Sequence, residues 1–332
     1  MVSYKQVLAS NALINDATVP SVAVFVGGTS GIGNLTIKAL VATGASVRIY
    51  LVGRSSAKER TLAFIEAQRN INAKAEIIWI EGDVSLLAES KRVCELIKSK
   101  EPRIDLLFMS TGYTPFGPRN ETAEGHEVTL ILAYYTRILF ILKLLPNLNA
   151  AEAPRIVTVL AGGHESVNVD LDDMELKKEG NFGPMKVFNQ NLPMTTMTME
   201  KIAEDNAHIT LIHSAPGWVD TGNVRKGMPP PNTILAWLIW LILEPLIHMF
   251  SFSDQESGQR YLFQATSAAF GGRGVSWNGK VGANSWGKTE DGLFIVGSKC
   301  DTISNGKVYS VLREKAKEKI WDYTMEVLKP YL

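Results

Sequence analysis

The feature that most constrains the fold is a short apolar run that enters a glycine-rich turn. Residues 22–26 read Val-Ala-Val-Phe-Val, which is too short for a helix and is typical of a buried strand. The turn at 27–33 contains Gly27, Gly31 and Gly33 and leads into an amphipathic helix. Such a junction gathers backbone N–H groups and a helix dipole where a phosphate can sit. A tight turn without a ligand would look the same, so the downstream sequence must decide.

Apolar runs alternate with amphipathic segments along the chain. We expect strands at 22–26, 47–52, 75–80, 105–109, 155–160 and 209–213, and further helices at 58–73, 86–100, 121–145 and 193–206. We expect Pro146 to stop the helix at 121–145. The alternation predicts an α/β fold, a doubly wound parallel sheet of the Rossmann type. Ligands of such sheets bind at the carboxyl ends of the strands.

Composition excludes some partners. Lysine plus arginine equals aspartate plus glutamate at 34 each, which argues against a nucleic-acid partner. Cys94 and Cys300 are far apart in the sequence, so neither a disulfide framework nor a metal site is indicated. The first residues lack the pattern of a secretory signal. We therefore expect a protein of the cytoplasm, without a metal.

The end of the second predicted strand carries the residues that would read the ribose of a dinucleotide. Arg54 and Ser55 stand about 20 residues after the glycine turn, where an acid would select NAD. A guanidinium and a hydroxyl suit a 2′-phosphate instead, so NADP(H) is the predicted cofactor. A solvated arginine at a strand end is the alternative interpretation.

Taken together, the turns resemble those of the short-chain dehydrogenase/reductase family over residues 20–225. The glycine turn matches except for a leading threonine, Asp83-Val84 matches the adenine-contacting turn, and Pro216 to Thr221 matches the turn that holds the nicotinamide carboxamide. Ser110-Thr111-Gly112 stands where the family has Asn-Ala-Gly. The cofactor-binding residues that the resemblance and the spacing imply are Gly27, Ser30, Gly31, Ile32, Gly33, Arg54, Ser55, Asp83, Val84, Ser110, Gly112, Pro216, Gly217, Val219 and Thr221. The C-terminal tail, from Ser253 to Ala269 and the last helix, is similar to that of fungal members of the family.

The catalytic half departs from the family's pattern of asparagine, serine, tyrosine and lysine. Alignment places Ala133, Ala161, Phe188 and Leu192 at those four positions. The tyrosine's absence does not depend on the alignment, because no tyrosine occurs between Tyr135 and Tyr261. The general acid that the family uses for proton transfer is therefore missing.

Few residues are candidates to replace that acid. His164 follows the fifth predicted strand and could serve as acid or base, although a surface loop histidine is equally consistent. Tyr134 and Tyr135 directly follow Ala133, the position of the lost asparagine, with helix packing as the alternative role. Arg137 shares the helical face of Ala133 and could instead pair with a helix carboxylate.

Three functions compete. The first is an NADPH-dependent reductase of a hydrophobic small molecule, a secondary-metabolite intermediate, with a non-standard site. The second is a non-redox cyclase or isomerase that uses the same scaffold, where proximity and shape drive the reaction. The third is a pseudoenzyme that binds cofactor and catalyses nothing.

In the last third of the chain, the sequence predicts an apolar lid followed by a helical extension. Within one domain of 1–332, we expect a core at 20–225, an apolar lid at 226–252 and a C-terminal helical extension at 253–332. The apolar run at 233–250 is broken by Glu244-Pro245, whereas a membrane-spanning helix needs about 20 apolar residues without such a break. This favours a lid that covers a hydrophobic pocket; a peripheral membrane contact is the alternative. We expect a strand at 293–296 and a helix at 308–328. Family members often form homodimers through the two long helices, which the lid and tail would hinder here.

Overall fold

A parallel sheet forms the centre of the computed structural model, which describes residues 2–217, Trp237 and 252–332. The strands are β1 (Val22–Val26), β2 (Val47–Gly53), β3 (Ala75–Glu81), β4 (Leu106–Met109), β5 (Arg155–Val159), β6 (Thr210–Ser214) and β7 (Leu293–Val296). In the described residues they make one seven-stranded sheet in the order β3-β2-β1-β4-β5-β6-β7, with every pairing parallel. This confirms the predicted Rossmann-type fold.

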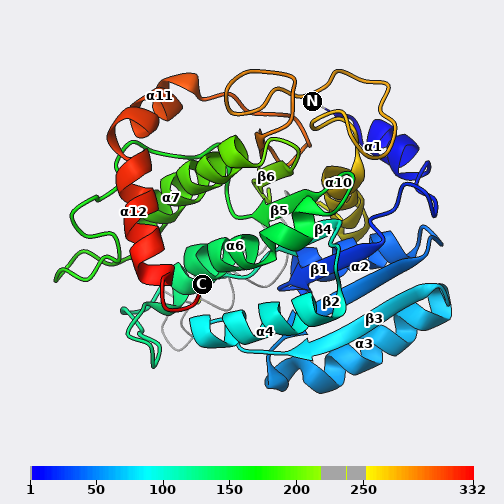
Figure 1. Ribbon diagram of the computed structural model, residues 1–332, viewed down its shortest axis with the longest axis horizontal. Helices are drawn as coiled ribbons and strands as arrows, with labels where there is room; N and C mark the ends of the chain where they lie inside the picture. Colours follow the sequence, from blue (N-terminus) through cyan, green and yellow to red (C-terminus); the bar gives the residue numbers. More distant parts are fainter. Residues whose placement is uncertain (1, 218–236, 238–251) are drawn as a thin grey trace.

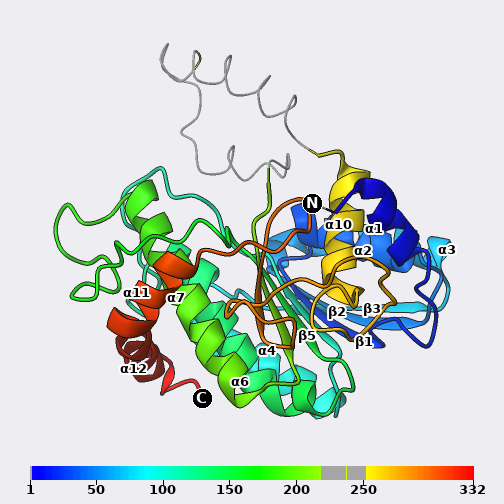
Figure 2. The same ribbon diagram turned by 90° about the horizontal axis from the view of Figure 1, so that it is seen from above.

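Helices cover both faces of the sheet (Figures 1 and 2). One face carries α1 (Tyr4–Asn11), α2 (Gly31–Val41), α3 (Lys58–Ile71) and α10 (Asp254–Thr266). The other carries α4 (Leu87–Lys100), α5 (Val128–Leu130), the π-helix η2 (Ile131–Tyr135), α6 (Thr136–Asn149), α7 (Pro184–Asp205), α11 (Gly306–Lys315) and α12 (Lys317–Leu328). A short 3-10 helix, η1 (Ser55–Ala57), follows β2. The central strands β1, β4 and β5 are buried along their whole length, which explains their mainly apolar sequences.

The helix predicted at 121–145 is shifted toward the C-terminus. It begins at Val128, where the Glu127 carboxylate accepts hydrogen bonds from backbone N–H groups of the first turn, and it runs past Pro146 to Asn149. Pro146 does not end it because the following residues are held by tertiary contacts. Asn147 donates to the Glu101 carbonyl at 2.6 Å, and Leu148 is fully buried. Packing therefore outweighs the local cost of the proline.

Two other helices differ from prediction. The helix predicted at 193–206 begins nine residues earlier, at Pro184, a residue preorganised for the first helical turn, and Pro193 lies within it. The helix predicted at 308–328 is two helices, α11 and α12, which separate at the buried residue Ala316. Both α11 and α12 lie along α7 (Figure 2).

The sheet extends beyond the predicted core of 20–225, because β7 pairs with β6 and α10 packs against α2. The predicted lid falls outside the described residues except for Trp237 and Phe252. Among the helices that the structure describes, the stretch Val128–Asn149 has the length and hydropathy to cross a membrane, yet 72% of its apolar window is buried inside the fold. Core helices of soluble proteins meet the same criteria, so this finding does not indicate a span.

Candidate functional site

The glycine turn closes against the end of β4. β1 pairs with both β2 and β4, so the chain reverses its winding direction at β1 and β4. A Cβ on Gly27, which has φ +97°, would lie 2.8 Å from the Thr111 nitrogen. A Cβ on Gly33 would lie 2.8 Å from the Gly27 carbonyl oxygen and from Ser110 Oγ. Only glycine fits at these two positions, and the turn lies at the crevice where doubly wound sheets bind nucleotides.

The first turn of α2 has no side-chain cap. Ser30 is the N-cap residue, but its side chain makes no capping hydrogen bond. Gly31 has φ +60°, and Ile32 packs into the core beneath the turn. The leading N–H groups of the helix are thus left without a side-chain acceptor from their own cap, which suits an anion.

The next two strand ends carry the predicted ribose and adenine residues. Arg54 and Ser55 are exposed after β2, and Arg54 has no carboxylate partner among the described residues. Asp83 follows β3, and its Oδ1 accepts from the backbone and the hydroxyl of Ser85 at 3.1 and 2.7 Å. The Val84 carbonyl accepts from Thr136 of α6 at 2.5 Å, which fixes the turn from below. The side chain of Asp83 is therefore oriented before any ligand arrives.

The remaining predicted cofactor residues follow β4 and β6. Ser110 donates to the Gly27 carbonyl at 3.1 Å. Gly112 has φ +130°, and among the described residues beyond its chain neighbours, Arg137 Nη2, at 3.8 Å, is the one atom within 4 Å of a Cβ placed there. Pro216 and Gly217 follow β6, whereas Val219 and Thr221 lie outside the described residues. The predicted residues that the structure describes therefore follow five strands, β1, β2, β3, β4 and β6, at the same edge of the sheet, and together they fit a dinucleotide.

A buried arginine links the ends of β4 and β5. Arg137 is 1% exposed, and it donates to the carbonyls of Leu132 at 3.2 Å, Val159 at 2.8 Å and Thr111. Its partners are carbonyls and not the helix carboxylate that we considered. Burial lowers the pKa of Arg137 to about 9. The guanidinium holds the two strand ends in place and puts a positive charge beside the crevice.

The π-helix explains part of that arrangement. It spans Ile131–Tyr135 and includes Ala133, the position aligned with the family's asparagine. The carbonyl of Leu132, inside this segment, accepts from Arg137 and also from the Thr111 hydroxyl at 2.9 Å. Single π-turns are frequent at functional sites. Here the irregular turn supplies the carbonyl that anchors Arg137.

The other aligned catalytic positions carry no acid–base group. Phe188, in the first part of α7, is 39% exposed, and Leu192 one turn later is buried. Ala161 follows β5. These three side chains offer shape and apolar contact near the carboxyl ends of the strands, and no proton.

The structure assigns packing contacts to the two candidate tyrosines. The Tyr134 hydroxyl lies 2.6 Å from Thr198 Oγ1 of α7 and 2.5 Å from Thr324 Oγ1 of α12. Tyr135 is 1% exposed and stacks edge-on against Tyr134. Burial raises the pKa of both hydroxyls. The helix-packing interpretation accounts for these contacts, and a role of either tyrosine as a proton donor stays a prediction.

His164 and Glu165 point in different directions after β5. His164 is exposed, with Nδ1 3.3 Å from the Ala161 carbonyl oxygen, so its predicted role stays a prediction. Glu165 is buried and accepts from Thr196 at 2.7 Å, Gly163 N–H at 2.9 Å and the Tyr309 hydroxyl at 3.0 Å. The loop therefore sends one polar side chain to solvent and the other into the core.

Sequence reasoning missed the partners of Glu165. Thr196 also lies 2.8 Å from Nδ1 of His213, which is fully buried on β6. His213 is the one ionisable residue in an otherwise uncharged buried strand, and that was the available signal. Burial lowers the pKa of His213 to about 4, so its imidazole is neutral at pH 7.

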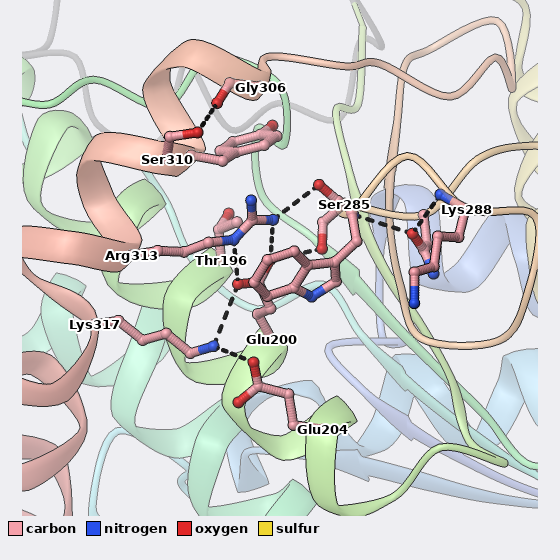
Figure 3. A network of polar contacts seen from close by, with 12 residues as sticks. Thr196, Glu200, Glu204, Ser285, Lys288, Gly306, Ser310, Arg313 and Lys317 are labelled. Carbon is pink, nitrogen blue, oxygen red and sulfur yellow. Dashed lines mark hydrogen bonds and ion pairs between the residues drawn. The ribbon is translucent and has the colours of Figure 1, made fainter.

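The C-terminal helices are fastened to α7 by a second buried carboxylate (Figure 3). Glu200 is 1% exposed and forms two bonds of 2.7 Å with Arg313, with Ser285 at 2.6 Å and Lys317 at 3.3 Å. Burial opposes ionisation of Glu200, but these donors outweigh it and hold its pKa below the usual value. The same helix α11 carries Tyr309, so this attachment also places a hydroxyl on Glu165.

Comparison with known proteins agrees with this geometry. Residues 21–167 match the sequence pattern of the family described as short chain dehydrogenase. "Oxidoreductase AN1596" of Emericella nidulans is 34% identical, covering 99% of this chain and 98% of that protein. "NmrA-like family domain-containing oxidoreductase notO" of an Aspergillus species is 33% identical over 98% and 94%.

A solved structure shows the same fold. The "Pseudomonas aeruginosa RhlG/NADP active-site complex" superimposes with a TM-score of 0.51 at 20% identity, covering 74% of this chain and 89% of that one. Three observations support one conclusion: the parallel sheet, the glycine turn between the ends of β1 and β4, and the relatives that match over nearly their full length. The chain belongs to the short-chain dehydrogenase/reductase family and is an oxidoreductase of that type.

Proposed function

We propose that the protein is an NADPH-dependent reductase of a hydrophobic small molecule, a secondary-metabolite intermediate, whose site works without the family's tyrosine. The observation that carries the proposal is the glycine turn closed on β4, because a Cβ at Gly27 or Gly33 would meet backbone at 2.8 Å. Members of this family bind a nicotinamide cofactor, and the turns that do so are present here.

Selection of NADPH over NADH rests on Arg54. Its guanidinium is exposed at the end of β2 and has no carboxylate partner among the described residues, so it is free to bind a 2′-phosphate. Ser55 adds a hydroxyl at the first position of η1. Strand ends at this position that prefer NAD carry an acid, which would repel the phosphate.

The chain's own residues bind and orient the reactants. When bound, a nicotinamide supplies the hydride. The α2 N-terminus holds phosphate, Asp83 is preset for adenine, and Arg137 places a positive charge beside the crevice. That charge favours electron density that develops on a substrate oxygen. Phe188 presents an apolar surface at the start of α7, which suits a hydrophobic substrate.

A non-redox cyclase or isomerase is the second candidate. Phe188 and Leu192 at the aligned tyrosine and lysine positions favour it, because shape and proximity would remain as catalytic factors. A pseudoenzyme that binds NADP(H) and catalyses nothing is the third. These candidates share the cofactor cradle and differ in whether NADPH is consumed.

The test is a fluorescence titration with NADPH and NADH, followed by NADPH consumption on hydrophobic ketones and enones, beginning with 2-decanone. Arg54→Gln should weaken NADPH binding roughly 10- to 100-fold, since one charged hydrogen bond contributes about 1.5–3 kcal/mol. NADH binding should not change. Arg69→Gln, an exposed arginine in the last turn of α3, is the matched control. Binding without consumption on every compound would favour the second and third candidates, and absence of binding would reject the reductase.

A further inference from the structure

The hydrogen bonds around Glu165 determine which nitrogen of His213 carries a proton. Glu165 accepts three donors, a pattern that suits the ionised carboxylate. Thr196 has one hydroxyl hydrogen, and its 2.7 Å bond to Glu165 uses it. Toward His213, Thr196 can then only accept, so the 2.8 Å contact requires a proton on Nδ1. Nε2 of His213 is left as a bare lone pair.

That lone pair has no donor among the described residues. Nε2 is buried without a hydrogen-bond partner, and so is the hydroxyl of Thr158. Thr158 and His213 are register partners on the adjacent strands β5 and β6, so their side chains share one face of the sheet. An unsatisfied buried polar atom costs about 1–3 kcal/mol, and two side by side indicate a polar group that this place binds.

The imidazole lies near the carboxyl ends of β5 and β6, where it is fully buried. His213 is the penultimate residue of β6, so it is close to the strand's carboxyl end. A Cβ on Gly162 would lie 3.1 Å from His213 Cγ, which shows that the ring packs against the turn that follows β5. That turn begins at Ala161, aligned with the family's serine. Arg137 reaches the last residue of β5 on the same face.

Building on the proposed reductase function, we propose that Nε2 of His213 exchanges the hydroxyl proton of the substrate. In alcohol oxidation the O–H bond breaks and an Nε2–H bond forms, while the carbon releases hydride to the nicotinamide and becomes a carbonyl. In reduction the imidazolium returns the proton to the oxygen as the hydride reaches the carbon. Glu165, Thr196 and Tyr309 are positioning residues that fix the Nδ1–H tautomer and offset the imidazolium charge.

Burial and the surrounding charges keep the imidazole neutral in the resting protein, so that Nε2 can accept a proton. Burial lowers the pKa of His213 most, Arg137 and His164 lower it further, and Glu165 raises it. The ring is therefore neutral before it meets a hydroxyl. Once protonated it is a stronger acid than an imidazolium in water, which favours release of the proton in the reverse step. Tyr309 comes from α11, which makes the C-terminal extension part of this arrangement.

The direct test is nitrogen NMR of the protein labelled at its five histidines, with the His213 signals assigned by His213→Asn. We expect a protonated Nδ1, a bare Nε2 and a shift of the Nε2 signal when NADP⁺ is added. A protonated Nε2, or a signal indifferent to bound NADP⁺, would overturn the inference while leaving the reductase proposal intact. Absence of NADP⁺ binding by the wild-type protein would overturn both.

A variant pair tests the proton transfer itself. His213→Asn keeps an amide N–H where Nδ1 lies, and so keeps the bond to Thr196, but it lacks Nε2. We expect unchanged NADPH affinity and turnover at least roughly 100-fold lower on the substrate that the ketone panel identifies. His208→Asn, just before the amino end of β6, is the matched control and should behave as wild type. Wild-type turnover in His213→Asn would refute the assignment.

Discussion

The two halves of the sheet edge are built in different ways. At the ends of β1 to β4 the backbone makes the site, and its polar groups stay accessible: Arg54 is exposed, and the α2 N-terminus lacks a side-chain cap. At the ends of β5 and β6 side chains make it, and Glu165 and His213 are buried beneath α7 and α11. The first half leaves its polar groups open to a ligand. The second half buries its polar groups in hydrogen-bonded contacts between strands and helices.

This difference predicts how each half should respond to substitution. Changes in the first half should weaken cofactor binding and leave stability nearly unchanged. Changes in the second should affect stability, because they leave buried charges or hydrogen bonds without partners. The predictions below test that separation, beginning with the largest expected effect.

Arg313→Met should destabilise the protein most. It removes the main cation from Glu200, which is 1% exposed, and breaking a buried ion pair from one side costs about 3–5 kcal/mol. Urea unfolding measures the loss. The control is Arg69→Met, whose pair with Glu66 is exposed and contributes at most about 0.5 kcal/mol. Equal stability of the two variants would show that the attachment of α11 contributes little.

His213 should make the fold sensitive to acid. Its pKa is about 4 when folded and near 6.5 when unfolded, so between these values only the unfolded chain binds the proton. Stability is fully present above pH 6.5 and should fall by about 3 kcal/mol as pH drops to 4. Burial causes most of this lowering of the pKa, Glu165 opposes it, and Arg137 and His164 add to it. His213→Asn should flatten that part of the pH profile, and an unchanged slope would contradict the burial of a neutral imidazole.

Asp83→Ala tests the cofactor half. Its carboxylate is oriented by Ser85 and lies at the predicted adenine contact. We expect roughly tenfold weaker NADPH binding, from the loss of one hydrogen bond to a charged group of about 1.5 kcal/mol. The unfolding midpoint should barely move. A large loss of stability with unchanged affinity would reverse the proposed contrast.

Tyr134→Phe should have the smallest effect. The substitution removes the hydroxyl that joins Thr198 and Thr324, which costs about 1 kcal/mol in thermal unfolding. NADPH affinity and turnover should match wild type, because the hydroxyl is in the helix packing. A loss of turnover at unchanged stability would restore Tyr134 as a proton donor.

Sequence patterns predicted what the backbone determines locally. The strands and the glycine turn follow from apolar runs and the conformational needs of Gly27 and Gly33. The polar cluster was out of reach, because Glu165, Thr196, His213 and Tyr309 come from four separate elements and meet only after packing. Pro146 was misread for a related reason: the burial of Leu148 outweighed a local rule.

The central claim is that the crevice between the carboxyl ends of β1 and β4 binds NADPH. Isothermal titration calorimetry of wild type and Gly33→Ala tests it most directly, since the added Cβ would lie 2.8 Å from the Gly27 carbonyl oxygen. Gly306→Ala is the control, because a Cβ there meets no atom of the described residues within 4 Å. We predict one NADPH per chain for wild type and control, and binding roughly 10- to 100-fold weaker in Gly33→Ala, as expected for 1–3 kcal/mol of overpacking. No heat of binding in the folded wild-type protein, or equal affinity in all three, would contradict the account.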